Sequence, residues 1–185
     1  MRRALPWILG GALVLGAGAL TALTPSDDAL IGPFVRAGSV GETVESRTLN
    51  AAVTDATFAD AIEVPGADWQ AEGNWLVITI AASAPRSEED AAIQLATLEV
   101  GGRGFQASER PAASLRDTDL RVGIDTVGTL AFELPPDVDA GRAELRLTTD
   151  YITPELDDLV VIGFELDDLP RVPRIEITDP GLGAP

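Results

Sequence analysis

The sequence predicts an all-β protein, an immunoglobulin-like β-sandwich of about seven or eight short strands preceded by one N-terminal transmembrane helix. Apolar and polar residues alternate over much of the chain, Gly and Pro turns separate the alternating segments, and a long uncharged stretch lies near the N-terminus. With 185 residues, the chain has room for one core. We expect an N-terminal membrane anchor or signal peptide, a linker, a β-sandwich domain and a flexible tail, at 1–24, 25–41, 42–178 and 179–185.

The N-terminal segment has the length and composition of a membrane span. No charged side chain lies between Arg3 and Asp27, and residues 4–24 are mostly Ala, Leu and Gly. A helix over this segment would be about 31 Å long at about 1.5 Å per residue, close to the hydrocarbon thickness of about 30 Å. Arg2 and Arg3 precede it, which places the N-terminus in the cytoplasm and the domain outside. We therefore expect a single-pass cell-membrane protein.

A cleaved signal peptide is the alternative interpretation of this segment. Ala17, Gly18 and Ala19 offer small residues after an apolar stretch, so cleavage near Ala19 would give a secreted protein. Either interpretation exports the domain. A lipid anchor is excluded, because the sequence contains no Cys. Residues 25–41 are rich in Pro, Gly, Ser and Asp, as in a linker, although Phe34 and Val35 interrupt it and could dock on the domain.

Alternation with a period of two predicts the strands of the sandwich. Residues 75–82 are apolar on both faces, which favours a central strand over an edge strand. The segment 46–58 is expected to be broken by a turn or bulge. The predicted strands cover residues 46–58, 75–82, 93–100, 120–124, 128–134, 143–149, 159–165 and 174–178.

Five stretches of the sequence together resemble a known family. They read GSVGETV from residue 38, GNWLVITIAASA from 73, LEVGGRGFQAS from 98, VGTLAFELP from 127 and AELRLTT from 143. Their order resembles the telokin-like, immunoglobulin-like envelope domains of unknown function on membrane-anchored or secreted proteins of Gram-positive bacteria. The resemblance covers residues 38–150 and implies a fold and a location, but no catalytic residue. The Lys-free composition, rich in Ala, Arg and Asp, is typical of an actinobacterial source.

Composition excludes several functional classes. The chain has 13 basic and 30 acidic residues, for a net charge of −17, so nucleic acid is excluded as a partner. Without Cys, His or Lys, it lacks thiol nucleophiles, imidazole bases and Schiff-base lysines. No Walker A or dinucleotide fingerprint occurs. We expect no enzymatic activity, no catalytic residues, no cofactor and no metal.

An acidic motif occurs twice around one predicted strand. The sequence ELDDL occupies residues 155–159 and again 165–169, on either side of an apolar segment. The acidic residues either discourage edge pairing of this strand or form a docking face for a basic partner. The candidate interaction surface consists of Glu155, Asp157, Asp158, Glu165, Asp167 and Asp168.

The expected function is that of a membrane-anchored extracytoplasmic interaction or accessory module of the cell envelope, which positions or binds a neighbouring membrane or wall protein. The alternative is a ligand- or calcium-binding module. Asp137 and Asp139 begin a calcium-like loop, but the bidentate Glu that completes such loops is missing. Trp69 and Trp75 could stack a sugar, whereas the low aromatic content of 5% favours packing roles for both.

Overall fold

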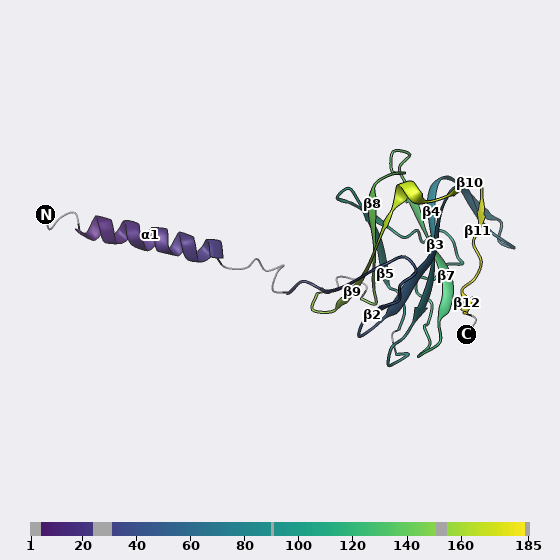
Figure 1. Ribbon diagram of the computed structural model, residues 1–185, viewed down its shortest axis with the longest axis horizontal. Coiled ribbons are helices and arrows are strands. Elements are labelled where there is room, and N and C mark those ends of the chain that lie inside the picture. The colour runs from purple at the N-terminus through teal and green to yellow at the C-terminus, as the bar shows by residue number, and fades with distance from the viewer. Residues whose placement is uncertain (1–4, 24–30, 90, 151–154, 184–185) are drawn as a thin grey trace. The chain divides into compact units, whose positions relative to one another are not determined.

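The computed structural model describes residues 5–23, 31–89, 91–150 and 155–183, and the chain divides into two compact units, Met1–Gly32 and Pro33–Pro185. In the first unit, α1 (Leu5–Leu23) is an α-helix of 19 residues within the predicted N-terminal segment (Figure 1). Within the described part of the chain, no helix meets the combined requirement of length and apolarity for crossing a membrane. The structure therefore contains a helix at this position, but the predicted transmembrane role is not supported.

The second unit is a β-sandwich of two sheets (Figure 1). The five-stranded sheet has the spatial order β1 (Phe34–Ser39), β9 (Asp158–Glu165), β8 (Arg142–Thr148), β5 (Leu95–Val100) and β6 (Arg103–Gln106). The seven-stranded sheet contains β10 (Arg171–Val172), β3 (Asn50–Val64), β4 (Trp69–Ser83), β7 (Thr126–Leu134) and β12 (Gly181–Leu182), with β2 (Val44–Glu45) and β11 (Ile175–Glu176) also paired to β3. The predicted all-β sandwich is confirmed.

The main core lies between the two sheets and follows the predicted alternation. Leu130 and Phe132 of β7 and Leu145 and Leu147 of β8 are all fully buried in this core. Each such side chain contributes about 1.5–3 kcal/mol by leaving water. In β8 the residue between the two leucines, Arg146, points away from the core, as expected for a strand with one buried face. In β7 the residue between Leu130 and Phe132 is Ala131, which is buried in a second apolar cluster on the other face.

Strand β4 is central and is covered on both faces, as predicted. It pairs antiparallel with β3 on one side and with β7 on the other. Leu76 and Ile78 belong to the main core, whereas Trp75 and Val77 belong to a second apolar cluster. The C-terminal segment contributes Ile177 to that second cluster. This covering segment explains why residues 75–82 of β4 have no polar face, whereas Gln70 and Glu72 in the first half of the strand are exposed.

Two predicted strands differ from the structure. Strand β3 is longer than predicted, and its pairing with β4 shifts register between Val53 and Asp55 and between Ala59 and Ala61. The irregularity expected in this segment is therefore present. Residues 120–124 form isolated bridges in place of the predicted strand. An adjacent backbone, rather than local alternation, decides whether such a short segment joins a ladder.

Both ends of the sandwich unit contain strands outside the predicted domain. Strand β1 falls inside the predicted linker 25–41 and pairs parallel with β9, from Phe34 opposite Asp158 to Ser39 opposite Gly163. Strand β12 falls inside the predicted flexible tail 179–185 and pairs with β7. Neither strand shows an alternation of apolar and polar residues. Both lie at sheet edges, where backbone hydrogen bonds hold a strand without a buried side-chain face.

Candidate functional site

The first residue of β9 is a buried carboxylate. The side chain of Asp158 is fully inaccessible to solvent (0% exposed). The backbone N–H of Arg47 donates to its Oδ2 at 2.7 Å, and Arg47 Nε lies 3.3 Å from its Oδ1. Arg36 Nε, from β1, lies 3.7 Å from Oδ2. Arg36 from strand β1 and Arg47 from the loop between β2 and β3 therefore compensate one buried charge.

The ionisation of Asp158 follows from these contacts. Burial opposes ionisation and would raise its pKa, but the backbone N–H of Arg47 and the charges of Arg47 and Arg36 act in the opposite direction. The balance places the pKa of Asp158 below its ordinary value. The carboxylate is thus ionised at neutral pH and holds the two arginines in place.

Arg47 links several groups around the start of β9. Its guanidinium donates to Asp157 Oδ1 at 3.1 Å and to the Leu156 carbonyl oxygen at 3.4 Å. The same guanidinium lies over the ring of Phe34, 5.3 Å from the ring centroid. These contacts position Phe34 and Leu156 beside each other at the N-terminal end of β1. We call this region, made of Phe34, Val35, Leu156 and Asp157, the β1 edge.

The β1 edge exposes apolar side chains to an unusual extent. Phe34, Val35 and Leu156 are 53%, 57% and 58% exposed. Isolated exposed apolar residues are common, but adjacent ones on one sheet edge often mark a binding surface. Figure 1 shows β9 beside β2 on this side of the sandwich.

Among the residues that the structure describes, part of the β1 backbone on this edge has no strand paired to it. In a parallel ladder, alternate residues direct their N–H and C=O groups toward the same neighbour. Phe34 N–H donates to the Asp157 carbonyl oxygen, so Val35 and Ala37 direct their backbone groups away from β9. At the far end of the strand, Glu42 accepts from the Ser39 N–H at 3.2 Å and closes the edge. The open part of the edge is therefore short and coincides with the exposed apolar residues.

The six predicted acidic residues do not share one environment. Asp158 is buried in contact with Arg47 and Arg36 and cannot be part of a surface, so its inclusion in the candidate interaction surface was wrong. A local sequence motif does not show that Arg47, 111 positions away, buries this carboxylate. Asp157 is half-buried and pairs with Arg47, while Glu155 is exposed beside it.

The second copy of the motif lies at the other end of β9. Glu165 closes that strand, and Asp167 and Asp168 belong to the short 3-10 helix η1 (Leu166–Asp168). Asp167 Oδ2 accepts a hydrogen bond from the Gly141 N–H at 2.7 Å, so it also stabilises a neighbouring loop. The two copies are separated by β9, and only the first copy adjoins the β1 edge. Whether either copy binds a partner stays a prediction.

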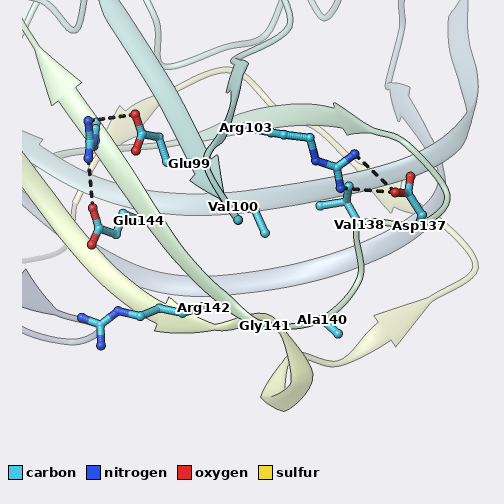
Figure 2. Close-up of a pocket in the computed structure, with 12 residues that line it drawn as sticks. Glu99, Val100, Arg103, Asp137, Val138, Ala140, Gly141, Arg142 and Glu144 are labelled. Carbon is cyan, nitrogen blue, oxygen red and sulfur yellow. Dashed lines mark hydrogen bonds and ion pairs between the residues drawn. The ribbon is translucent and has the colours of Figure 1, made fainter.

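Residues of β5 and β8, together with the turn after β5 and the loop before β8, line an open pocket of about 640 Å³ (Figure 2). Arg103 pairs with Asp137 at 3.3 Å, and a second arginine, Arg146, bridges Glu99 at 2.8 Å and Glu144 at 3.2 Å. Figure 2 shows these pairs on opposite sides of the pocket. In these ion pairs the acidic and basic side chains of the pocket neutralise one another. Asp137, which begins the calcium-like loop, is one of the paired residues.

The alternative function, calcium binding, requires a cluster of oxygen ligands. Across the residues that the structure describes, no group of three or more acidic side chains is placed to hold a metal ion. Calcium binding requires six to eight oxygen ligands gathered around one point. The described loops therefore do not add support to the calcium alternative.

Comparison with known proteins gives similarities of fold only. No protein-family model matches the chain, and no curated protein is significantly similar to it in sequence. Among solved structures, a candidate lipoprotein from Staphylococcus aureus is 11% identical with a TM-score of 0.47, covering 75% of this chain and 97% of that one. An uncharacterized β-sandwich protein from Clostridium difficile 630 is 10% identical with a TM-score of 0.46, covering 76% and 99%.

A third solved structure, the yjhA protein from Bacillus subtilis, is 17% identical with a TM-score of 0.43, covering 67% of this chain and 98% of that one. Similarities at this level assign neither a family nor an activity to the chain. The telokin-like resemblance and the actinobacterial source stay predictions from the sequence.

Proposed function

We propose that this protein is an exported, immunoglobulin-like interaction module of the cell envelope that docks a neighbouring membrane or wall protein through the β1 edge. The observation that carries the proposal is that Phe34, Val35 and Leu156 are each more than half exposed around one short strand edge, with Phe34 and Val35 on opposite faces of it. Such an edge supports two kinds of contact at once, apolar side-chain packing and backbone pairing with an added strand.

The partner we propose is a protein that presents an apolar strand flanked by basic side chains. The chain has a net charge of −17, and Glu155 and Asp157 adjoin the exposed apolar residues. Complementary charge speeds association and fixes the orientation of a partner, while buried aromatic and aliphatic side chains supply most of the affinity. Phe34 is the residue best suited to that anchoring role.

Tethering to the membrane is the second part of the proposal. It rests on the uncharged apolar segment between Arg3 and Asp27, which ends at Ser26, eight residues before Phe34. A tethered domain meets its neighbours at a high effective concentration, so a small edge suffices for docking. Alkaline extraction of membranes, with protease digestion of intact spheroplasts, tests the anchor and the export of the domain separately.

Site-specific photocrosslinking tests the docking surface. A photoreactive residue is placed at Val35, at Leu156 or at Leu182 of the full chain in native membranes. Leu182 is the matched control, because it is a 69% exposed apolar residue on an edge strand of the other sheet. We expect Val35 and Leu156 to crosslink the same protein, less strongly at high salt because charge attraction is screened, and Leu182 not to crosslink it. The proposal would be contradicted if the probe at Leu182 captured that protein, or if neither Val35 nor Leu156 captured it.

A further inference from the structure

A cluster of two tryptophans, an arginine and a glutamate lies on the seven-stranded sheet, whereas β1 belongs to the other sheet. Trp69 and Trp75 belong to β4, Glu133 belongs to β7, and Arg110 lies in the connection between β6 and β7. Arg110 Cζ is 5.7 Å from the Trp69 ring centroid and 5.9 Å from the Trp75 ring centroid. Its Nη1 donates to Glu133 Oε2 at 3.1 Å. One guanidinium therefore lies over two indole rings and is held by one carboxylate.

The cluster contains a buried donor without an acceptor. Trp75 is fully buried, and among the described residues its indole Nε1–H has no hydrogen-bond partner. An unpaired buried N–H is costly, by about 1–3 kcal/mol, so it requires an explanation. Glu133 supplies a complementary group: within the described chain only its Oε2 is paired, which leaves Oε1 able to accept a hydrogen bond.

A glycine lies beside both this donor and this acceptor. A Cβ atom on Gly73 would lie 3.3 Å from Trp75 Nε1 and 3.8 Å from Glu133 Oε1. Gly73 has a φ of 155°, a conformation that favours glycine, so this space is kept free of a side chain by the backbone itself. We call the space beside Gly73, between these two atoms, the Gly73 notch.

The groups around the Gly73 notch match one chemical group, a hydroxyl. A hydroxyl accepts from Trp75 Nε1–H through a lone pair and donates its proton to Glu133 Oε1. Beside the notch, half-buried Trp69 offers an aromatic surface and Arg110 offers further N–H donors. A ligand with hydroxyl groups on its rim and C–H groups on its face uses all four residues together.

We propose that the Gly73 notch, with Trp69 and Arg110, is a binding site for a neutral saccharide. One sugar hydroxyl occupies the notch between Trp75 and Glu133, and the sugar face packs on Trp69. Arg110 covers the rings in the free protein, and its half-exposed side chain (52%) swings aside while remaining near Glu133. The inference is independent of the docking function proposed for the β1 edge.

Titration followed by NMR tests the saccharide site. The full chain, labelled with ¹⁵N-tryptophan, is studied in a polyoxyethylene detergent, which contains neither a sugar nor an ammonium group. Maltotriose and N,N′,N″-triacetylchitotriose, both neutral, are the probes, and the Trp75 indole N–H signal is assigned by its loss in Trp75→Phe. We expect at least one of these sugars to shift that signal saturably, because the unpaired N–H gains an acceptor.

Two substitutions and one control make the test specific. Glu133→Gln keeps the shape of the side chain but removes the charged acceptor, so affinity should fall about tenfold or more. Trp69→Ala removes the aromatic surface and should weaken binding as well. Asp137→Asn is the matched control, since Asp137 is also an exposed carboxylate paired with an arginine, Arg103, that stacks on an aromatic ring. It should bind like the unmodified chain.

Three results would overturn the proposal. If neither sugar shifts the Trp75 signal, the notch holds water only. A shift produced by tetramethylammonium but by neither sugar would mean that the two rings form a cage for organic cations. Equal effects of Glu133→Gln and Asp137→Asn would mean that the sugar does not bind at this notch. Circular dichroism of each variant separates loss of binding from loss of fold.

Discussion

Asp158 Oδ2 accepts a hydrogen bond of 2.7 Å from the backbone N–H of Arg47, a residue 111 positions earlier in the chain. Asp158 begins β9 of the five-stranded sheet, and Arg47 lies between β2 and β3 of the seven-stranded sheet. The bond therefore connects the two sheets at one end of the sandwich. Since the carboxylate is buried, removal of its charge has consequences for stability that surface carboxylates do not share.

We expect Asp158→Asn to lower the free energy of unfolding at pH 7 by about 1–3 kcal/mol, because a charged acceptor of two arginines is lost. Urea denaturation measures the change. Asp168→Asn is the control, since Asp168 is exposed, and its effect should stay within about 0.5 kcal/mol. Equal stability of the two variants would show that the Asp158 network does not stabilise the fold.

The pKa of Asp158 predicts how this difference depends on pH. Its folded-state pKa lies below the unfolded value of about 3.9, so its contribution is fully present above that value and is lost as pH falls through the folded pKa. The stability difference between the unmodified chain and Asp158→Asn should be constant from pH 7 to about pH 5 and shrink below about pH 4. Urea midpoints measured across this range check the sign, and a difference that grew in acid would contradict it.

Gly38→Ala should destabilise the attachment of β1. A Cβ atom on Gly38 would lie 2.5 Å from Cγ2 of Val44, a buried core residue, so Val44 or β1 must move. We expect a loss of about 1–3 kcal/mol, as for other overpacked sites. Amide hydrogen exchange should quicken in β1 and β9. Gly181→Ala, where an added Cβ meets nothing within 4 Å, is the control and should leave exchange in β1 unchanged.

Ile177→Ala tests whether the C-terminal segment belongs to the fold. Ile177 is buried against Trp75 and Val77 in the second apolar cluster, so its truncation leaves a cavity. The expected loss is about 2–4 kcal/mol in the free energy of unfolding. Ile124→Ala removes the same atoms from a half-exposed side chain and should cost much less. Matching losses in thermal denaturation would mean that the segment covers the sheet only loosely.

The strand pattern was predictable because it depends on local periodicity. Leu145 and Leu147 alternate with polar residues, and Leu130 and Phe132 alternate with Thr129, Ala131 and Glu133, and this alternation by itself indicates which face packs in the main core. The apolar composition of β4 likewise predicted a central strand. Strands β1 and β12 were missed, because an edge strand held by backbone hydrogen bonds carries no such pattern.

The candidate site was predictable only in part. The apolar residues Phe34 and Val35 and the acidic residues near Leu156 are visible in the sequence, but the sequence predicted that Phe34 and Val35 could dock on the domain, whereas both are more than half exposed. The partnership between Arg47 and Asp158 is not, since a pair separated by 111 positions leaves no local signal. The Gly73 notch is equally invisible, because it depends on where β7 places Glu133 beside β4.

By itself, the sequence determined the secondary-structure class, the acidic charge and the apolar N-terminal segment of this protein, because periodicity and composition act through neighbouring residues. Only the tertiary structure decided that Asp158 is an internal ion-pair partner and that the Trp75 indole N–H has no acceptor among the described residues. The physical reason is that the cost of a buried charge or an unpaired donor depends on which distant groups surround it. Those neighbours are specified by the pairing of strands.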